Sequence, residues 1–236
     1  MKSPLDFGAV LIDIGVVETT QKYAIDQLHA GKRVGVVYAE NQTHGRGRFN
    51  RHWVSEEGQS LTASLIFHAY PNHPAPYLIG MALAIAAAGA IHAQLQWPND
   101  LVIRGKKVGG ILTEWIPTFM GERVAVVGIG INLNQTEFPE EIRERATSLH
   151  LAYGHAYEGR KVLQKIIERL ALVPEPTSWS ALAPAWQIFD QTKGKKYKLP
   201  DGQIALGLGI GSEGQLMASI DGESHSVLAA DAIFGA

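Results

Sequence analysis

The sequence predicts an α+β fold: a mixed, mostly antiparallel sheet packed against helices, followed by a small β-barrel. Three strand-like segments, 60–67, 100–115 and 122–134, lie close together along the chain, which favours antiparallel pairing. The tail from about residue 191 consists of short apolar runs separated by Asp-Gly and Ser-Glu-Gly turns, as in small barrels. We therefore expect two domains, over residues 1–190 and 191–236.

The first part of the chain alternates predicted helices and strands. A helix is expected over 18–31, with a threonine as N-cap and a glycine after its last turn. Strands are expected over 33–40 and 60–67, with a long loop between them. The apolar run 76–91 is shorter than the roughly 18 to 20 residues needed to cross a bilayer, so it predicts a buried helix and no membrane association.

The middle of the chain is predicted to be mostly strand. A short strand stops at Pro98, because proline cannot continue a sheet ladder. The segment 100–115 predicts a hairpin with its turn at 104–106, and its second strand is expected to pair with the strand over 122–134.

Helices are predicted after these strands, over 138–149, 159–173 and 181–189. The second of them has one apolar stripe, and its charged residues are expected to face solvent. We expect the helices to pack on one face of the sheet.

Composition and charge exclude several classes of protein. The chain has 21 Lys and Arg against 23 Asp and Glu, so it lacks the basic surplus of a nucleic-acid-binding protein. It contains no cysteine, which excludes disulfides, thiolate nucleophiles and cysteine metal sites. Pro4, Asp6 and Gly8 interrupt the N-terminal apolar residues, so we expect no signal peptide and a cytoplasmic location.

The loop 40–53, ENQTHGRGRFNRHW, is a candidate anion-binding segment. Gly45 and Gly47 alternate with Arg46 and Arg48, so the backbone can bend tightly while the guanidinium groups spread to meet a carboxylate or a phosphate. A solvated turn is the alternative interpretation of this pattern.

Polar residues next to predicted strands supply further candidates. Asn99 and Asp100 follow a proline at a corner between strands, where side chains can project into a cleft; a local Asx turn is the alternative. Lys107 precedes Gly109 and Gly110 in a strand, and paired glycines are best tolerated where a ligand or a second backbone comes close. An exposed lysine at a hairpin tip is the alternative there.

Several common catalytic motifs are absent. The stretch GIGIN begins like a dinucleotide-binding fingerprint, but Leu133 stands where the third glycine would be and no helix is predicted to follow. No Walker A, HExxH or G-x-S-x-G sequence occurs. The nine histidines are dispersed, so no protein metal site is predicted.

In order along the chain, ETTQ, Q-T-H-GRGR-x-x-R-x-W, WPND, a lysine followed by GGIL, and GIGINLN closely resemble biotin protein ligases. With the β-rich tail, the resemblance covers nearly the whole chain. It implies a catalytic domain over 1–190 with a class II synthetase-like α+β fold, and an SH3-like domain over 191–236. It also implies an enzyme that activates biotin with ATP and Mg²⁺ to biotinyl-5'-AMP. The biotinyl group would then pass to a lysine of the biotin carboxyl carrier protein of acetyl-CoA carboxylase.

The resemblance also assigns roles to individual residues. The residues that match the family's biotin contacts are Thr19, Thr20, Gln21, Gln42, Arg46, Gly47, Arg48 and Lys107. The residues that resemble its adenylate-side positions are Arg51, Trp53, Asn99, Asp100 and Asn132. We expect Lys107, Arg48 and Asp100 to take part in the chemistry. We expect Gly45, Gly109 and Gly110 to shape the binding site.

Some positions depart from the family's usual pattern. Gln96 stands where lysine is usual, Asn50 where glycine is usual, and Gln21 where asparagine is usual. The first change removes a positive charge expected near the phosphates. The chain enters the catalytic domain at once, so we expect a ligase-only member without a DNA-binding domain and with no nucleic-acid partner. A homodimer is a further expectation, since family members often pair.

Two other functions stay open at this point. A lipoate or octanoate ligase or transferase shares the architecture but attaches a different acid. A non-catalytic biotin or nucleotide sensor would bind through the same loop without reacting. The GRGR, WPND and GGIL set favours biotin, and Lys107 and Arg51 favour catalysis.

Overall fold

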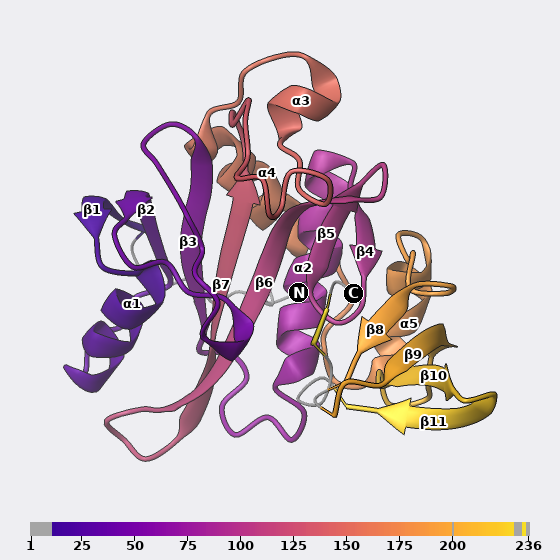
Figure 1. Cartoon of the computed structure of the whole chain (residues 1–236). Helices are drawn as coiled ribbons and strands as arrows, with labels where there is room; N and C mark the ends of the chain where they lie inside the picture. Colours follow the sequence, from indigo (N-terminus) through magenta and orange to yellow (C-terminus); the bar gives the residue numbers. More distant parts are fainter. Residues whose placement is uncertain (1–10, 200, 229–232, 235–236) are drawn as a thin grey trace.

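The computed structural model of the protein describes residues 11–199, 201–228 and 233–234. Its larger sheet has the strand order β1-β2-β3-β7-β6-β5-β4 (Figure 1). The strands are β1 (Leu11–Val17), β2 (Val36–Gln42), β3 (Ser60–Phe67), β4 (Gln94–Gln96), β5 (Asp100–Ile103), β6 (Lys106–Pro117) and β7 (Arg123–Asn132). β1 and β2 pair parallel and the other neighbours pair antiparallel, which confirms the mixed, mostly antiparallel sheet.

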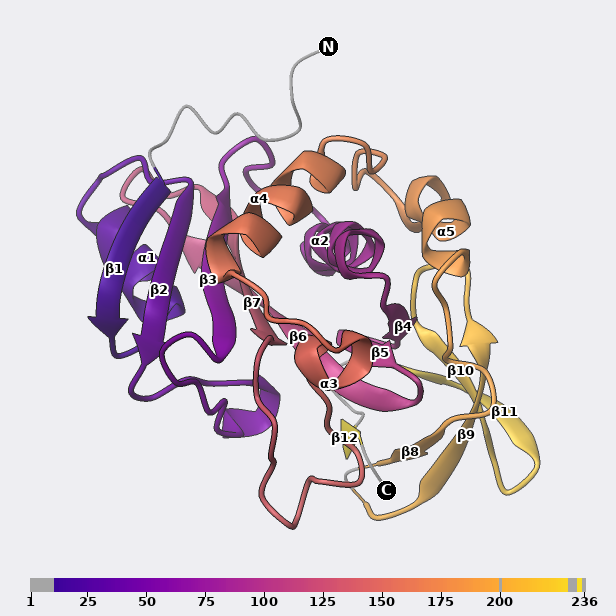
Figure 2. The same cartoon turned by 90° about the horizontal axis from the view of Figure 1, so that it is seen from above.

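Helices cover both faces of this sheet. They are α1 (Thr20–His29), α2 (Tyr77–Ile91), α3 (Leu149–Tyr153), α4 (Gly159–Leu170) and α5 (Trp179–Gln187). α2 lies across one face, with α4 and α5 on either side of it (Figure 2). Every residue of α2 from Leu78 to Ala88 is buried, which confirms the predicted core helix.

α1 packs on the opposite face, so the expectation that the helices share one face is wrong. Its Ala24 and Leu28 belong to a separate core that includes Ile66 of β3. The neighbouring Leu65 belongs to the core around α2. Because successive strand residues point to opposite faces, the adjacent Leu65 and Ile66 of β3 can bury against helices on opposite sides of the sheet.

Residues 138–149 do not form the predicted helix. They form turns that lead into α3. A competing backbone pairing explains this difference: Lys107 N donates to Arg145 O at 2.7 Å, and Thr147 N donates to Lys107 O at 2.8 Å. Groups that are bonded to β6 in this way cannot complete a helical hydrogen-bond ladder.

The tail forms a second, antiparallel sheet with the strand order β11-β10-β9-β8-β12 (Figure 1). Its strands are β8 (Lys196–Lys198), β9 (Ile204–Ile210), β10 (Leu216–Ile220), β11 (Glu223–Val227) and β12 (Ile233–Phe234). Trp97 joins the two sheets: its backbone N–H donates to Thr192 Oγ1 at 3.1 Å and its indole N–H donates to Gly214 O at 2.9 Å.

Two expectations concern parts of the chain that are not described. The first ten residues, on which the signal-peptide prediction depends, lie outside the described ranges, and the side chain of Asn50 is also not described. Among the described residues, no helix combines the length and the apolar character needed to cross a membrane.

Candidate active site

A cavity of about 1560 Å³ opens on the face of the large sheet that carries α1. Its walls come from β3, β6, β7, the start of α1, the arginine-rich loop, the corner at 96–100 and the first residues of the tail sheet. All of the predicted site residues line it except Gly45 and Gly109. Segments that are far apart in the sequence therefore meet in one cavity.

Glycines on β6 and β7 make the floor of the cavity. Gly110 lies opposite Gly130 in the strand register. A methyl group at Gly130 would lie 2.6 Å from Trp53 Cε2, and one at Gly128 would lie 2.9 Å from Gln21 Oε1. These glycines let the indole ring and the amide rest directly on the sheet. The GIGIN motif thus alternates floor positions with buried isoleucines.

One part of the cavity is a network of uncharged polar groups at the start of α1. Thr20 Oγ1 bonds to Ser64 Oγ at 2.9 Å, and Ser64 Oγ donates to Gln21 Oε1 at 2.8 Å. Gln42 Oε1 accepts from the backbone N–H of Thr20 at 2.8 Å, and Gln21 Nε2 donates to Val126 O at 2.9 Å. Because these groups are neutral and held in place, they suit the uncharged polar part of a ligand.

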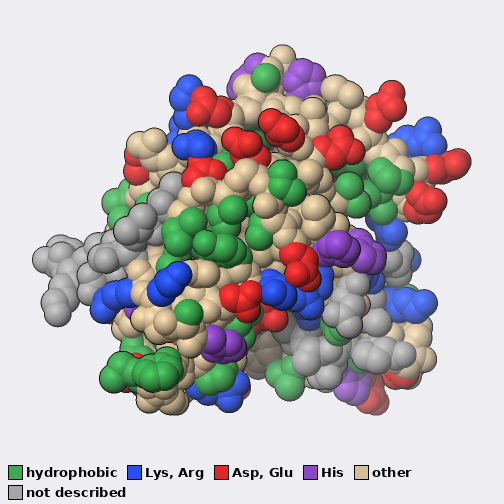
Figure 3. All heavy atoms as spheres, turned by 90° about the vertical axis from the view of Figure 1, so that its left-hand side faces the viewer, with side chains coloured by type: hydrophobic (Ala, Val, Ile, Leu, Met, Phe, Trp, Pro, Cys, Tyr) green, Lys and Arg blue, Asp and Glu red, His purple; other side chains and the backbone are tan. Residues whose placement is uncertain are grey.

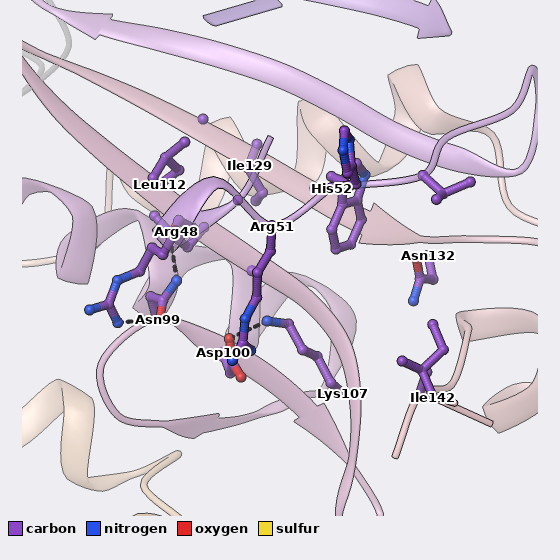
Figure 4. A pocket seen from close by; sticks show the side chains of 18 of the residues that line it. Arg48, Arg51, His52, Asn99, Asp100, Lys107, Leu112, Ile129, Asn132 and Ile142 are labelled. Atoms are coloured by element: carbon purple, nitrogen blue, oxygen red, sulfur yellow. Dashed lines mark hydrogen bonds and ion pairs between the residues drawn. The ribbon is translucent and has the colours of Figure 1, made fainter. Parts of the chain in front are cut away.

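Another part of the cavity gathers basic side chains around one carboxylate. Lys107 Nζ donates to Asp100 Oδ1 at 2.5 Å, and Arg48 Nη1 donates to Asn99 Oδ1 at 3.3 Å (Figure 4). The side chain of Arg51 points to the same place (Figure 4). Burial lowers the pKa of Arg48, Asp100 opposes this shift, and Arg51 adds to it. The excess positive charge suits an anionic group.

β6 fixes the positions of Lys107 and of the corner that carries Asn99. The β5–β6 register shifts between Leu101 and Val102, and the backbone of Lys107 pairs with residues 145–147 instead of continuing a regular ladder. Further along β6, Ile111 N donates to Asn99 O at 2.9 Å, and Asn99 Nδ2 donates to Ile111 O at 2.7 Å. The corner that carries Asn99 is therefore fixed relative to the strand that carries Lys107.

Gly45 and Gly109 permit close backbone packing and do not line the cavity. A methyl group at Gly109 would lie 2.5 Å from Gly130 O, and one at Gly45 would overlap Trp53 O. The backbone N–H of Trp53 also donates to Gly45 O at 2.8 Å. The sequence predicted that a ligand or a second backbone comes close to the paired glycines. For Gly109 the close neighbour is the backbone of β7 at Gly130.

The arginine-rich loop closes on itself above the cavity. Gly47 N donates to Arg51 O at 2.8 Å, and Arg46 forms an isolated bridge with His52. Arg46 is exposed at the rim, whereas Arg48 is half-buried and lies 4.9 Å from the ring centre of Phe49. Phe49 has a φ of 54°, a left-handed conformation that costs a bulky residue about 1–2 kcal/mol.

Asn132 and Trp53, two of the predicted adenylate-side residues, differ in whether their side-chain N–H groups have a hydrogen-bond partner. Asn132 is 8% exposed, and its side-chain amide donates to Thr147 O at 3.0 Å. The indole N–H of Trp53 is buried and has no acceptor among the described residues. Within the described part of the chain, the indole N–H of Trp53 thus lies unpaired against the glycine floor, whereas the amide of Asn132 fastens β7 to the loop before α3.

Sequence reasoning missed several residues that line the cavity: Ser64, Gly128, Gly130, Lys195 and Lys196. Ser64 could have been found because Ser60, Thr62 and Ser64 alternate with apolar residues and therefore place hydroxyl groups on one face of the predicted strand. The two glycines could have been found from their alternation with isoleucine, which is the period of a strand. Nothing near the two lysines in the sequence indicates the cavity, because the fold brings them there from the tail.

Comparison with known proteins places these features in a family. The sequence pattern of the Biotin/lipoate A/B protein ligase family matches residues 14–134. The chain belongs to this family. The matched range includes the polar network, the arginine-rich loop, the corner at 96–100 and the glycine floor.

Individual family members agree with this placement. The Bifunctional ligase/repressor BirA of Bacillus subtilis is 38% identical over 169 residues, which are 68% of this chain and 52% of the relative. The chain thus spans about half the length of the Bacillus relatives it matches. The biotin–acetyl-CoA-carboxylase ligase of Mycobacterium tuberculosis is 30% identical over 215 residues, 84% of this chain and 78% of the relative.

The fold is shared with solved family structures. The biotin protein ligase from Aquifex aeolicus in complex with biotin and ATP superposes with a TM-score of 0.74 at 27% identity. The match covers 94% of this chain and 97% of the Aquifex chain. This coverage includes both sheets, so the α+β fold with a small β-rich tail is the one found in that ligase.

Proposed function

We propose that this chain is a biotin protein ligase. It would activate biotin with ATP to biotinyl-5'-AMP and transfer the biotinyl group to a lysine of a biotin carboxyl carrier protein. The observation that carries the proposal is the meeting of Arg48, Arg51 and Lys107 in a cavity that also holds a fixed, neutral polar network. An acid with an uncharged polar head suits such a cavity, and similarity to ligases that bind biotin and ATP supports it.

In the first half-reaction, a carboxylate oxygen of biotin attacks the α-phosphorus of ATP. A bond forms between these atoms, the bond from the α-phosphorus to the bridging oxygen breaks, and pyrophosphate leaves with the electron pair. Both reactants are anions, so their repulsion must be offset by fixed positive charge. Lys107 and Arg48 would supply this charge next to the reacting oxygens, and Arg51 would supply it on the phosphate side.

Mg²⁺ fits this site as an ion held mainly by phosphate and water. Among the described residues, no group of three or more metal-binding side chains occurs. Mg²⁺ does not require one, because it commonly keeps several waters and binds through one or two carboxylates plus phosphates. Asp100 is the carboxylate that could help to hold it. When bound, the ion would neutralise part of the phosphate charge.

In the second half-reaction, the acceptor lysine attacks the acyl carbon of biotinyl-5'-AMP. An amide bond forms, the bond between the acyl carbon and the phosphate oxygen breaks, and AMP leaves. A lysine has an ordinary pKa of about 10.4, so its ammonium must first lose a proton. Asp100, the carboxylate within the basic cluster, would accept this proton or orient the amine.

The roles of the remaining residues follow from their positions. We assign the biotin head to Thr19, Thr20, Gln21 and Gln42, the rim of the site to Arg46 and Gly47, and the floor to Gly110. We assign the adenylate to Trp53, Asn99 and Asn132. The loop that carries Arg48 would close over the mixed anhydride and exclude the water that would hydrolyse it.

Further parts of the proposal concern the organisation of the protein. We assign catalysis to residues 1–190, with 191–236 as a separate small domain, and place the ATP-dependent reaction in the cytoplasm. A second copy could pair along the edge strand β1. Val16 of β1 is 64% exposed. Figure 3 shows the side of the molecule that lies on the left in Figure 1, and hydrophobic side chains gather near the middle of that face.

Biotin-dependent exchange of labelled pyrophosphate into ATP tests the proposed function. Exchange with biotin and not with lipoate or octanoate is expected. Exchange that requires lipoate or octanoate would identify a ligase for a different acid. Binding of biotin or ATP without any exchange would identify a sensor. The proposed homodimer is tested separately, by sedimentation of the protein with and without biotin and ATP.

A further inference from the structure

Lys195 and Lys196, in the turn before β8 and at its first residue, line the same cavity as Arg48 and Lys107. Neither tail lysine forms an ion pair with any residue in the described part of the chain. Lys107, by contrast, is paired with Asp100 at 2.5 Å. The tail therefore adds positive charge to the cavity that is not tied up in an ion pair with a described carboxylate.

The backbone of these lysines is fixed relative to the cavity. Gly194 N donates to Gly207 O, and Gly207 N donates to Lys195 O, each at 2.8 Å. Tyr197, fully buried, packs its ring edge-on against Trp97 with 6.1 Å between ring centres. Trp97 lies two residues before Asn99, so the tail lysines and the corner at 96–100 belong to one packed unit.

Gln96 is neutral, so the positive charge that Lys195 and Lys196 add to the cavity matters more for binding an anion. Gln96 lies on β4 and lines the cavity, and its backbone is opposite Asp100 in the register. This wall of the cavity therefore contributes a carboxylate but no cation. Asp100 pairs with Lys107 and so takes up part of the positive charge of this cluster, and further cations near the phosphates of a nucleoside triphosphate would strengthen its binding even with Mg²⁺ present.

We infer that Lys195 and Lys196 bind the β- and γ-phosphates of the nucleoside triphosphate and the pyrophosphate that it releases. The inference rests on the proposed function, which assigns Lys107 and Arg48 to the reacting carboxylate and the α-phosphate. Of the other cations that line the cavity, Arg46 is exposed at the rim and Arg145 already has an interaction, so we assign the other two phosphates to the tail lysines. These phosphates are absent from biotinyl-5'-AMP, so the lysines serve adenylation and not transfer.

The test measures binding of αβ-methylene ATP, whose α–β linkage does not cleave, by calorimetry with saturating biotin. Lys195→Gln/Lys196→Gln is expected to bind it about tenfold more weakly than the wild type, since each partly exposed ion pair contributes up to about 1 kcal/mol. Lys198→Gln is the matched control, because Lys198 is an exposed lysine of the same strand that does not line the cavity. It is expected to bind within about twofold of the wild type.

A second readout separates a phosphate contact from a general role in folding. Single-turnover transfer from preformed biotinyl-5'-AMP to the carrier should proceed at the wild-type rate in the double variant. Adding Gln96→Lys to the double variant should recover part of the lost nucleotide affinity, because it returns a cation to another wall of the same cavity. Failure to recover any affinity would count against a charge effect.

The outcomes also separate this inference from the proposed function. Equal nucleotide affinity in the wild type and the double variant would overturn the inference, and so would equal loss of both half-reactions. A wild type that binds αβ-methylene ATP through these lysines but shows no exchange with biotin would overturn the proposed function and leave the inference standing.

Discussion

Lys107 Nζ lies 2.5 Å from Asp100 Oδ1, which makes the two side chains a close ion pair within the cavity. The side chain of Asp100 is 11% exposed and that of Lys107 is 43% exposed. The carboxylate is therefore shielded, while the ammonium group keeps an open side. A substrate carboxylate or phosphate would approach that open side, and Asp100 would hold Lys107 in place behind it.

Replacing Lys107 by alanine is expected to lower biotin-dependent pyrophosphate exchange by about 100- to 1000-fold, because a fixed donor to the transition-state charge is lost. Lys106→Ala is the matched control. Lys106 precedes Lys107 on β6, but its Nζ donates to Arg143 O at 3.3 Å and it does not line the cavity. Near-normal exchange in Lys107→Ala would refute the role assigned to this lysine.

Replacing Asp100 by asparagine is expected to slow transfer from preformed biotinyl-5'-AMP to the carrier by about 100-fold. Asparagine keeps the shape but cannot accept the proton of the attacking amine. Asp190→Asn is a control on a carboxylate outside the cavity, where Asp190 Oδ1 accepts from Thr192 N. An unchanged single-turnover rate in Asp100→Asn would remove Asp100 from the second half-reaction.

Strands with strong local signals could be predicted from the sequence. The strand over 60–67 is observed with the predicted bounds, because an uncharged, largely apolar segment is flanked by polar and turn residues on both sides. β1 was not predicted, since Asp13 and Gly15 interrupt its apolar pattern and it pairs with a strand beyond α1. The helix over 138–149 was predicted wrongly because its charged residues favour a helix locally, whereas pairing with Lys107 is a tertiary interaction.

Some residues of the candidate site could likewise be predicted from local motifs, whereas others depend on the tertiary structure. The arginine-rich loop, the corner at 96–100 and Lys107 could be selected from local motifs, and all three reach the cavity. The sequence does not show that Asp100 and Lys107 are paired, because this depends on the β5–β6 register. It also gives no indication of Lys195, whose position depends on how the tail sheet packs against Trp97.

Replacing Gly130 by alanine is expected to displace Trp53 from the floor of the cavity. A methyl group there would lie 2.6 Å from Trp53 Cε2, so the ring must move or the strand must shift. We expect a loss of about 1–3 kcal/mol in the free energy of unfolding and weaker ATP binding, since Trp53 is assigned to the adenylate. Gly15→Ala is the control, because a methyl group at Gly15 meets nothing within 4 Å. Equal melting temperatures for the two variants would contradict the proposed floor.

The loop over 43–51 is expected to be cut by trypsin in the free protein and protected once biotin and ATP are added. Arg46 and Arg51 are exposed in this loop, and Phe49 is held in a left-handed conformation. Relief of that strain and new contacts to the ligand both favour a closed form. Mass spectrometry of the fragments would locate the cleavage. Equal rates of cutting with and without ligands would show that the loop does not close.

Replacing Arg48 by glycine is expected to let the intermediate escape. Arg48 is half-buried, its Nη1 donates to Asn99 Oδ1, and burial lowers its pKa, so its guanidinium is held inside the cavity and out of bulk solvent. Without that group, the loop loses its link to the corner, and the cavity loses a cation next to the proposed acyl phosphate. Biotinyl-5'-AMP should then leave faster, as measured by its release in a rapid filtration assay. Arg46→Gly is the comparison, since Arg46 lies exposed at the rim. If both variants released the intermediate at the wild-type rate, Arg48 would not be the residue that retains it.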